Sequence, residues 1–153
     1  MKRLTLFVDG AARGNPGPAG IGVVVQEGDT LLKEIGDPLG IATNNVAEYT
    51  ALIRALEAAR DLGADAVSVF TDSELMERQL LGIYRVRTPH LLPLYERALE
   101  LLRGFRETSV IHIPREKNRH ADYLSNLGAD RVEGRKTARK DPRRSPGPKV
   151  EEP

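Results

Sequence analysis

The alternation of apolar and polar residues divides the first 130 positions into short strands and amphipathic helices. Runs rich in Val, Ile and Leu are typical of strands, whereas apolar residues three or four positions apart are typical of helices. The pattern predicts strands at residues 4–9, 19–26, 30–36, 66–71 and 108–113. It predicts helices at residues 45–62, 73–81, 90–103 and 118–129, which gives the order βββαβα(α)βα.

The spacing of these elements indicates how the strands pair. The first three strands follow one another closely, with a Gly28-Asp29 turn between the second and third, and this is typical of an antiparallel meander. Helices separate the later strands, and such crossover connections join parallel strands. We therefore predict an α/β fold with a five-stranded mixed sheet, three antiparallel strands and then two parallel ones, flanked by helices.

Composition narrows the class of protein. The chain has 153 residues, 40% of them apolar and 29% charged, which suits one domain with a real core. It contains no cysteine, which excludes disulfides, thiolate metal sites and cysteine nucleophiles. The sequence holds no apolar run near the ~18 residues of a membrane span and no signal-peptide pattern. We expect a cytoplasmic monomer with no membrane contact.

The formal net charge of +1 is unevenly distributed. Residues 131–153 contain eight Lys and Arg against four acids, a net charge of +4, so residues 1–130 carry −3. The C-terminal stretch is also rich in proline and poor in large apolar residues, so we predict a disordered basic tail after a domain spanning residues 1–130. The tail either tethers the protein to a polyanion or is merely solvated chain.

Two aspartates follow predicted strands. Alternation places Asp9 at the end of the first strand, on the face of Thr5 and Phe7, and Asp72 follows the fourth strand. If these strands are parallel neighbours, the two carboxylates end side by side, and a cation is needed to keep both ionised. Each also has an ordinary explanation, because Asp9-Gly10 is a common turn dipeptide and Asp72 could be a helix N-cap.

Two further acids belong to helices. Glu48 lies in the first turn of the predicted long helix, beside its apolar stripe, where it could instead close a capping box. Asp122 lies near the start of the last helix, where a single acid is unremarkable. Four acids at one edge of a sheet would form an all-oxygen site of the kind that Mg²⁺ and Mn²⁺ prefer. Two such ions ~3.5–4 Å apart are the machinery of phosphodiester hydrolysis.

Four segments together resemble the type 1 ribonuclease H family over residues 1–130: DGAARGNPGPAG, ATNNVAEYTAL, FTDSE and NRHADYLSN. The resemblance implies a ribonuclease H-like fold and an endoribonuclease that cuts the RNA strand of RNA–DNA hybrids, leaving 5′-phosphate products. It also implies two Mg²⁺ ions, with Mn²⁺ as an alternative, held by Asp9, Glu48, Asp72 and Asp122.

The same resemblance indicates residues that contact the substrate, namely Gly10, Asn15, Thr43, Asn44 and Asn45. The Gly-rich segment lets backbone N–H groups approach a nucleic acid, and it is not a P-loop because no Gly-Lys-Ser/Thr follows. Plain N-capping is the ordinary explanation for the two adjacent asparagines.

The sequence departs from the family pattern in two places. Many members carry a catalytic His on a loop before the last Asp, and here either Arg115 takes that position or His120 reaches in; His112 falls within a strand. The segment GIYRVRTPH replaces a basic protrusion, as in a shorter branch of the family, so double-stranded RNA is a further expected substrate.

Other functions remain open. A non-catalytic nucleic-acid- or protein-binding module could share the fold, and strand-transfer enzymes or exonucleases use similar acids.

Overall fold

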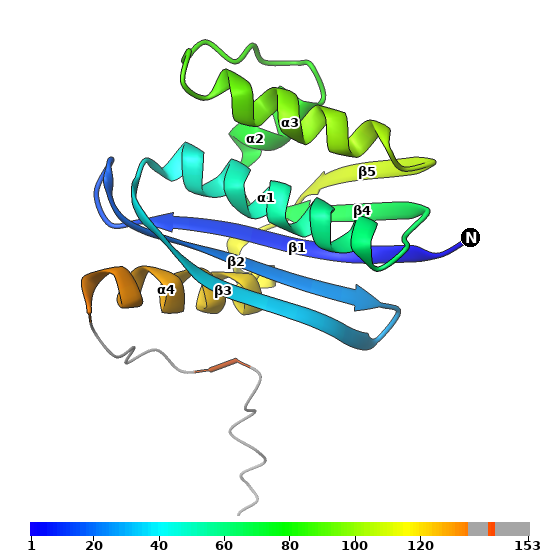
Figure 1. The fold of residues 1–153 in the computed structure, drawn as a ribbon, viewed down its shortest axis with the longest axis horizontal. Helices are drawn as coiled ribbons and strands as arrows, with labels where there is room; N and C mark the ends of the chain where they lie inside the picture. The colour runs from blue at the N-terminus through cyan, green and yellow to red at the C-terminus, as the bar shows by residue number, and fades with distance from the viewer. Residues whose placement is uncertain (135–140, 143–153) are drawn as a thin grey trace, which may run out of the picture.

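The computed structural model describes residues 1–134 and 141–142, and residues 1–134 form one sheet with helices on both faces (Figure 1). The strands are β1 Arg3–Ala12, β2 Gly17–Glu27, β3 Thr30–Ala42, β4 Ala66–Thr71 and β5 Glu107–His112. The helices are α1 Asn44–Asp61, α2 Glu74–Leu80, α3 Leu92–Arg103 and α4 Arg119–Glu133, with a 3-10 turn, η1 Arg115–Lys117, before α4.

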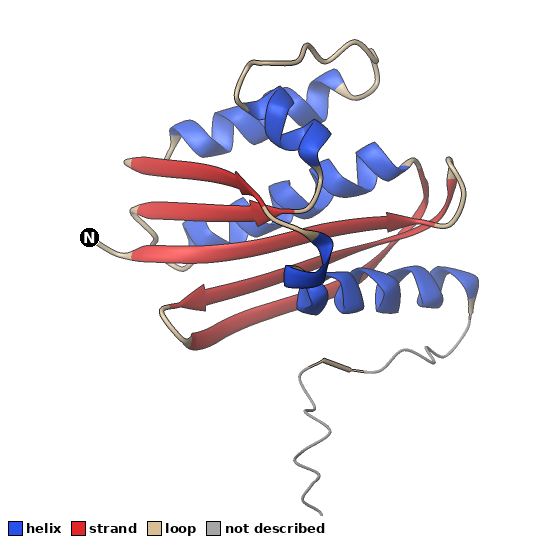
Figure 2. Ribbon diagram, turned by 180° about the vertical axis from the view of Figure 1, so that it is seen from behind, coloured by secondary structure: helices blue, strands red, loops and turns tan. Residues whose placement is uncertain are grey.

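The strands lie in the order β3-β2-β1-β4-β5. β1 pairs antiparallel with β2, and β2 pairs antiparallel with β3, whereas β4 lies parallel to both β1 and β5. The predicted mixed sheet is therefore confirmed. α1 packs on one face with α3 beside it, and α4 packs on the other face, so the molecule has three layers (Figures 1 and 2).

The two faces of β1 pack against different helices. Leu4, Leu6 and Val8 are fully buried in the larger apolar cluster, which lies between the sheet and helices α1 and α3. Phe7 points the other way, into a small cluster formed with α4 around Val24. This is the alternation that the sequence predicts, so the assignment of faces in β1 is confirmed.

Glycines in the two central strands let the helices approach the sheet closely. A Cβ atom at Gly10 of β1 would lie 2.3 Å from the carbonyl carbon of Ala47 in α1. A Cβ atom at Gly22 of β2 would lie 2.0 Å from the carbonyl oxygen of Ala121 in α4. Since real side chains do not approach this closely, only glycine permits these helix–sheet distances, and Gly22 is the residue paired with Asp9 in the sheet.

Several elements are longer than the pattern predicts. β1 continues for three residues beyond Asp9, because Gly10 to Ala12 still pair with β2. β3 continues through Pro38 to Ala42, and this is possible because β3 is an edge strand in which proline need not donate to a neighbour. The glycine-rich connection between β1 and β2 is correspondingly shorter than the sequence suggests.

The C-terminal helix also extends beyond its predicted end. α4 runs to Glu133, so the first three residues of the predicted tail are helical, and Gly134 then adopts a left-handed conformation. The rest of that predicted tail, residues 135–140 and 143–153, lies outside the described residues. Among the helices that the structure describes, none has the length and apolar character needed to cross a bilayer.

Candidate active site

Asp9 and Asp72 lie side by side at the point where β1 and β4 separate. Val8 opposite Thr71 is the last parallel pair, so the next residue of each chain segment is an aspartate. Asp9 does not end its strand, as the sequence suggested, because it remains paired with Gly22 of β2. The expectation that the two carboxylates meet is nevertheless confirmed.

Asp72 is not a helix cap. Ser73 is the N-cap of α2, and its hydroxyl accepts a hydrogen bond from the Met76 N–H at 3.1 Å. The Asp72 carboxylate instead accepts a 3.2 Å hydrogen bond from the side-chain amide of Asn118, which also donates to the Val8 carbonyl at 2.9 Å. The start of α4 is thereby tied to both strands.

Glu48 reaches the same point from α1. The N-cap of α1 is Thr43, whose hydroxyl accepts from the Val46 N–H, so the expected capping roles of Asn44 and Asn45 are wrong. Glu48 therefore lies in the second turn rather than the first, and no capping box forms. Its carboxylate accepts a 3.0 Å hydrogen bond from the Gly10 N–H, which directs it toward β1.

These three acids form a compact group. One carboxylate oxygen from each of Asp9, Glu48 and Asp72 lies within 4.8 Å of the other two, and both Asp9 and Glu48 are only 5% exposed. Burial, followed by the neighbouring charges of Asp72 and Asp122, raises the pKa of the Asp9 carboxyl to about 8, although a hydrogen bond from Ser125 lowers it. Burial, followed by the charges of Asp9 and Asp72, raises the pKa of Glu48 well above its ordinary value. Such a group favours a bound cation.

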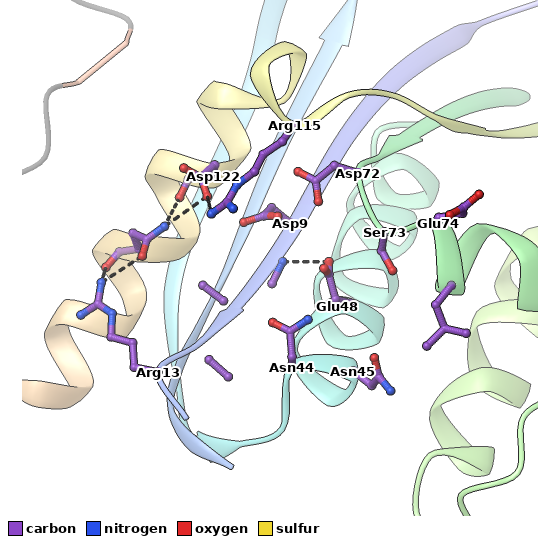
Figure 3. A pocket seen from close by; sticks show the side chains of 15 residues that line it. Asp9, Arg13, Asn44, Asn45, Glu48, Asp72, Ser73, Glu74, Arg115 and Asp122 are labelled. Carbon is purple, nitrogen blue, oxygen red and sulfur yellow. Dashed lines mark hydrogen bonds and ion pairs between the residues drawn. The ribbon is translucent and has the colours of Figure 1, made fainter. Parts of the chain in front are cut away.

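Asp122 and Arg115 complete one wall of a pocket of about 620 Å³ that contains the three acids (Figure 3). Asp122 is in the first turn of α4, and it lies outside the group of three whose oxygens fall within 4.8 Å. Arg115, in η1, is 81% exposed, and its guanidinium lies 4.0 Å from the Asp122 carboxylate. The structure thus brings all five predicted catalytic residues to one pocket, with Asp122 at its edge.

Neither of the two nearby histidines lines this pocket. His120 is on α4, but its ring pairs with Glu34 of β3, so the possibility that His120 reaches the carboxylates is wrong. His112 is in β5, as expected.

The residues expected to contact substrate divide into two groups. Gly10, Asn44 and Asn45 line the pocket, although the Gly10 N–H is already bound to Glu48. Asn15 and Thr43 do not line it. Asn15 accepts a hydrogen bond from the Asn44 N–H at 3.1 Å, which links the β1–β2 connection to the start of α1.

Sequence reasoning missed the polar residues around the predicted acids, among them Asn118, which donates to Asp72. The buried Ser125 hydroxyl donates to Asp9 at 2.6 Å, and Asn126, one turn after Asp122, donates to that carboxylate at 3.3 Å. Arg13 lines the pocket and donates to Asn126. The i, i+4 spacing of Asp122 and Asn126 was a usable signal, whereas the Arg13 contact joins residues 113 positions apart.

Comparisons with known proteins agree with this geometry. Residues 7–128 match a family described as "Reverse transcriptase-like". The crystal structure of RNase H1 from Halobacterium salinarum superposes with a TM-score of 0.81 at 48% identity, covering 84% of this chain and 98% of that one. The chain belongs to the type 1 ribonuclease H family.

Two further comparisons show how much of the chain resembles other family members. Ribonuclease HI of Halobacterium salinarum is 49% identical over 129 residues, which are 84% of this chain but 65% of that protein. The chain thus spans just under two thirds of this curated relative's length. A structure of LC11-RNase H1, described as a complex with an RNA/DNA hybrid, has a TM-score of 0.78 at 43% identity, covering 84% of this chain and 98% of that one.

Proposed function

We propose that this ribonuclease H family member is a metal-dependent endoribonuclease that hydrolyses the RNA strand of RNA–DNA hybrids and leaves 5′-phosphate products. The observation that carries the proposal is the buried group of Asp9, Glu48 and Asp72, whose oxygens lie within 4.8 Å of one another. The description of the LC11-RNase H1 complex with a hybrid supports the choice of substrate.

The donor set fits hard divalent cations. All the ligands offered are carboxylate oxygens, which Mg²⁺ and Mn²⁺ prefer, and the raised pKa values of Asp9 and Glu48 show how poorly the group tolerates its charge alone. We propose that Asp9, Glu48, Asp72 and Asp122 would hold two Mg²⁺ ions. Bound ions of this kind lower the pKa of a water molecule and stabilise the leaving oxygen.

The chain's own residues then orient the reaction. Glu48 is held in place by the Gly10 N–H. We assign it a contact with the ribose 2′-hydroxyl, the group that distinguishes RNA from DNA. Asn44 and Asn45 present amide groups to the pocket for the substrate backbone, and Asn15 fixes the backbone of Asn44. We assign Thr43 a phosphate contact in addition to its role as N-cap.

Arg115 takes the position that a loop histidine has in other family members. Its exposed guanidinium at the pocket rim suits the binding and release of a phosphate. Because an arginine does not lose its proton near neutral pH, we do not assign it a proton-transfer role. We further propose that the protein acts as a cytoplasmic monomer.

A cleavage assay on an end-labelled RNA–DNA hybrid tests the proposal. We expect cleavage with Mg²⁺, no cleavage after EDTA, and recovery when Mg²⁺ is restored. Asp9→Asn is the matched inactive control because it removes one charge at constant shape. Hybrid binding without any cleavage, in either metal, would indicate the non-catalytic binding module instead.

A substrate panel sharpens the choice of nucleic acid. Hybrid, double-stranded RNA and duplex DNA are compared with Mg²⁺ and with Mn²⁺. We expect the hybrid to be cut fastest, double-stranded RNA more slowly, and DNA not at all.

A further inference from the structure

Asn126 is a buried residue whose side-chain amide connects Asp122 to Arg13, the residue that follows β1. It is only 6% exposed, and its side-chain NH₂ donates to the Asp122 carbonyl oxygen at 2.9 Å and to the Asp122 carboxylate Oδ1 at 3.3 Å. Both contacts fall within one turn of α4. The side chain therefore holds the main chain and the carboxylate of the same aspartate.

Arg13 fixes which way this amide points. Its guanidinium donates to the Asn126 side-chain oxygen at 3.0 Å and to the Asn126 main-chain oxygen at 3.3 Å. Because arginine has only donors, the amide oxygen must face Arg13 and the NH₂ must face Asp122. Arg13 is in turn held by ion pairs to Asp130 and Glu133 near the end of α4.

This arrangement occupies one oxygen of Asp122 and spares the other. Asn126 and the more distant Arg115 both approach Oδ1. Within the described residues, Oδ2 has no hydrogen bond or ion pair. Asp122 is also the carboxylate that lies outside the compact group of three, so its orientation depends most on its neighbours. A carboxylate restrained through one oxygen presents the other in a defined direction.

We propose that Asn126, oriented by Arg13, is a positioning residue that restrains Asp122 through Oδ1 and leaves Oδ2 available to a ligand in the pocket. The catalytic consequence rests on the proposed nuclease function, whereas the contact itself does not. The role differs from a purely structural one, because it requires the NH₂ donor of Asn126 and not only an acceptor for Arg13.

Two substitutions separate these roles. Asn126→Asp keeps the shape and the acceptor for Arg13 but replaces the donor with an oxygen that repels Asp122. Asn126→Ala removes both contacts. We expect Asn126→Asp to lower kcat for hybrid cleavage by ~10–100-fold, as is usual when a partner of a ligating residue is changed. The loss should be larger than that of Asn126→Ala, and the KM for the hybrid should be unchanged. A purely structural role predicts the reverse order, with Asn126→Asp close to wild type.

A thermal unfolding cycle tests the contact without any activity. Asn126→Asp is measured in the wild-type chain and in the Asp122→Asn chain, both free of metal. We expect Asn126→Asp to lower Tm by about 3 °C more in the wild-type chain, which has the Asp122 carboxylate, than in the Asp122→Asn chain. An equal effect in both backgrounds would overturn the proposal.

Glu107→Gln is the control for a change of one surface charge, because Glu107 pairs with Arg3 and does not line the pocket. We expect wild-type kcat for this variant, and a loss equal to that of Asn126→Asp would show that the effect does not depend on the contact with Asp122 and would overturn the proposal. If the wild-type chain cleaves no hybrid, the proposed function fails, and the unfolding cycle still decides whether Asn126 restrains Asp122.

Discussion

The two faces of the sheet have different compositions and different tasks. The face covered by α1 and α3 is packed almost entirely with apolar side chains, from Leu4 in β1 to Leu101 in α3. The face covered by α4 has only a small apolar cluster, and α4 presents Asp122, Ser125 and Asn126 to the pocket and to Asp9. One face of the sheet therefore supplies most of the buried apolar surface, and the other supplies most of the polar contacts at the site.

Glu48 is the exception that joins the two faces. It comes from the apolar side, where α1 is otherwise buried, and it reaches the cluster only because Gly10 lets α1 approach β1. Substitutions on the two sides should therefore separate stability from chemistry.

The largest effect is expected at the centre of the acidic group of Asp9, Glu48 and Asp72. At neutral pH the folded, metal-free protein must keep a proton on the buried Asp9 carboxyl, and this costs stability because the unfolded chain releases that proton. Asp9→Asn removes this cost, so the variant should be more stable without metal, while Mg²⁺-dependent cleavage should fall by at least ~1,000-fold. Thermal unfolding and hybrid cleavage measure the two quantities on the same sample. Loss of both stability and activity would mean that Asp9 is needed for the fold itself.

The next largest effect is expected where α4 meets the sheet. Gly22→Ala places a methyl group where the Ala121 carbonyl lies, so α4 must shift, and a misplacement of ~1 Å at a catalytic group can cost ~100-fold in turnover. Gly104→Ala at the end of α3 is the control, because its nearest contact would be 3.3 Å away. Steady-state cleavage rates of the two variants test the contrast, which fails if both remain at wild-type turnover.

A substitution on the apolar face should act on stability alone. Leu52→Ala leaves a cavity in the larger cluster and should lower the free energy of unfolding by ~2–5 kcal/mol. Leu81, which is 53% exposed, provides a matched Leu→Ala control with a change within about 0.5 kcal/mol. Urea unfolding measures both, and cleavage by folded Leu52→Ala at low temperature should match wild type. A selective loss of activity would contradict the division between the faces.

The acidic group should also make the stability of the metal-free protein depend on pH. Between the ordinary Asp pKa of 3.8 and about 8, the folded protein keeps a proton on Asp9 that the unfolded chain has released. Stability should therefore fall as the pH rises through this window, and Mg²⁺ should reduce the fall. Thermal unfolding from pH 5 to 8 with EDTA, for wild type and Asp9→Asn, tests this. A slope that Asp9→Asn leaves unaltered would assign the effect to other groups.

The smallest effect is expected from the basic C-terminal segment. Removing residues 135–153 keeps α4 and its contacts with Arg13 but deletes seven Lys and Arg. We expect hybrid binding to weaken a few-fold and its dependence on salt to become shallower. Fluorescence anisotropy at several salt concentrations measures both, and an unchanged salt slope would show that the segment makes no electrostatic contact with the hybrid.

The pattern of the sequence was sufficient for most of the fold but not for every boundary. β4 was predicted at the residues observed, because turn residues and Asp72 bound a short apolar run. β3 was predicted too short, because Pro38 and Gly40 usually end a strand and the pattern does not reveal that this strand lies at an edge. Edge position is a property of the assembled sheet.

The candidate site, like the fold, could be predicted from the sequence only in part. The side-by-side placement of Asp9 and Asp72 was predicted on the condition that β1 and β4 are parallel neighbours, and this pairing is confirmed. The surrounding polar contacts could not be predicted, because Ser125 meets Asp9, and Arg13 meets Asn126, across more than a hundred positions. The turn that holds Glu48 depended on which residue caps α1, and three adjacent capping residues, Thr43 to Asn45, made that choice ambiguous.

Three consecutive residues of β1 each hold a different part of the site. The Val8 carbonyl accepts from Asn118, Asp9 supplies a carboxylate, and the Gly10 N–H holds Glu48. Adding or deleting a single residue within β1 would detach all three connections together and exchange the faces of the strand. At the β2–β3 hairpin tip, a Cβ atom on Gly28 would meet no atom within 4 Å, so a loop inserted there should leave these three connections intact.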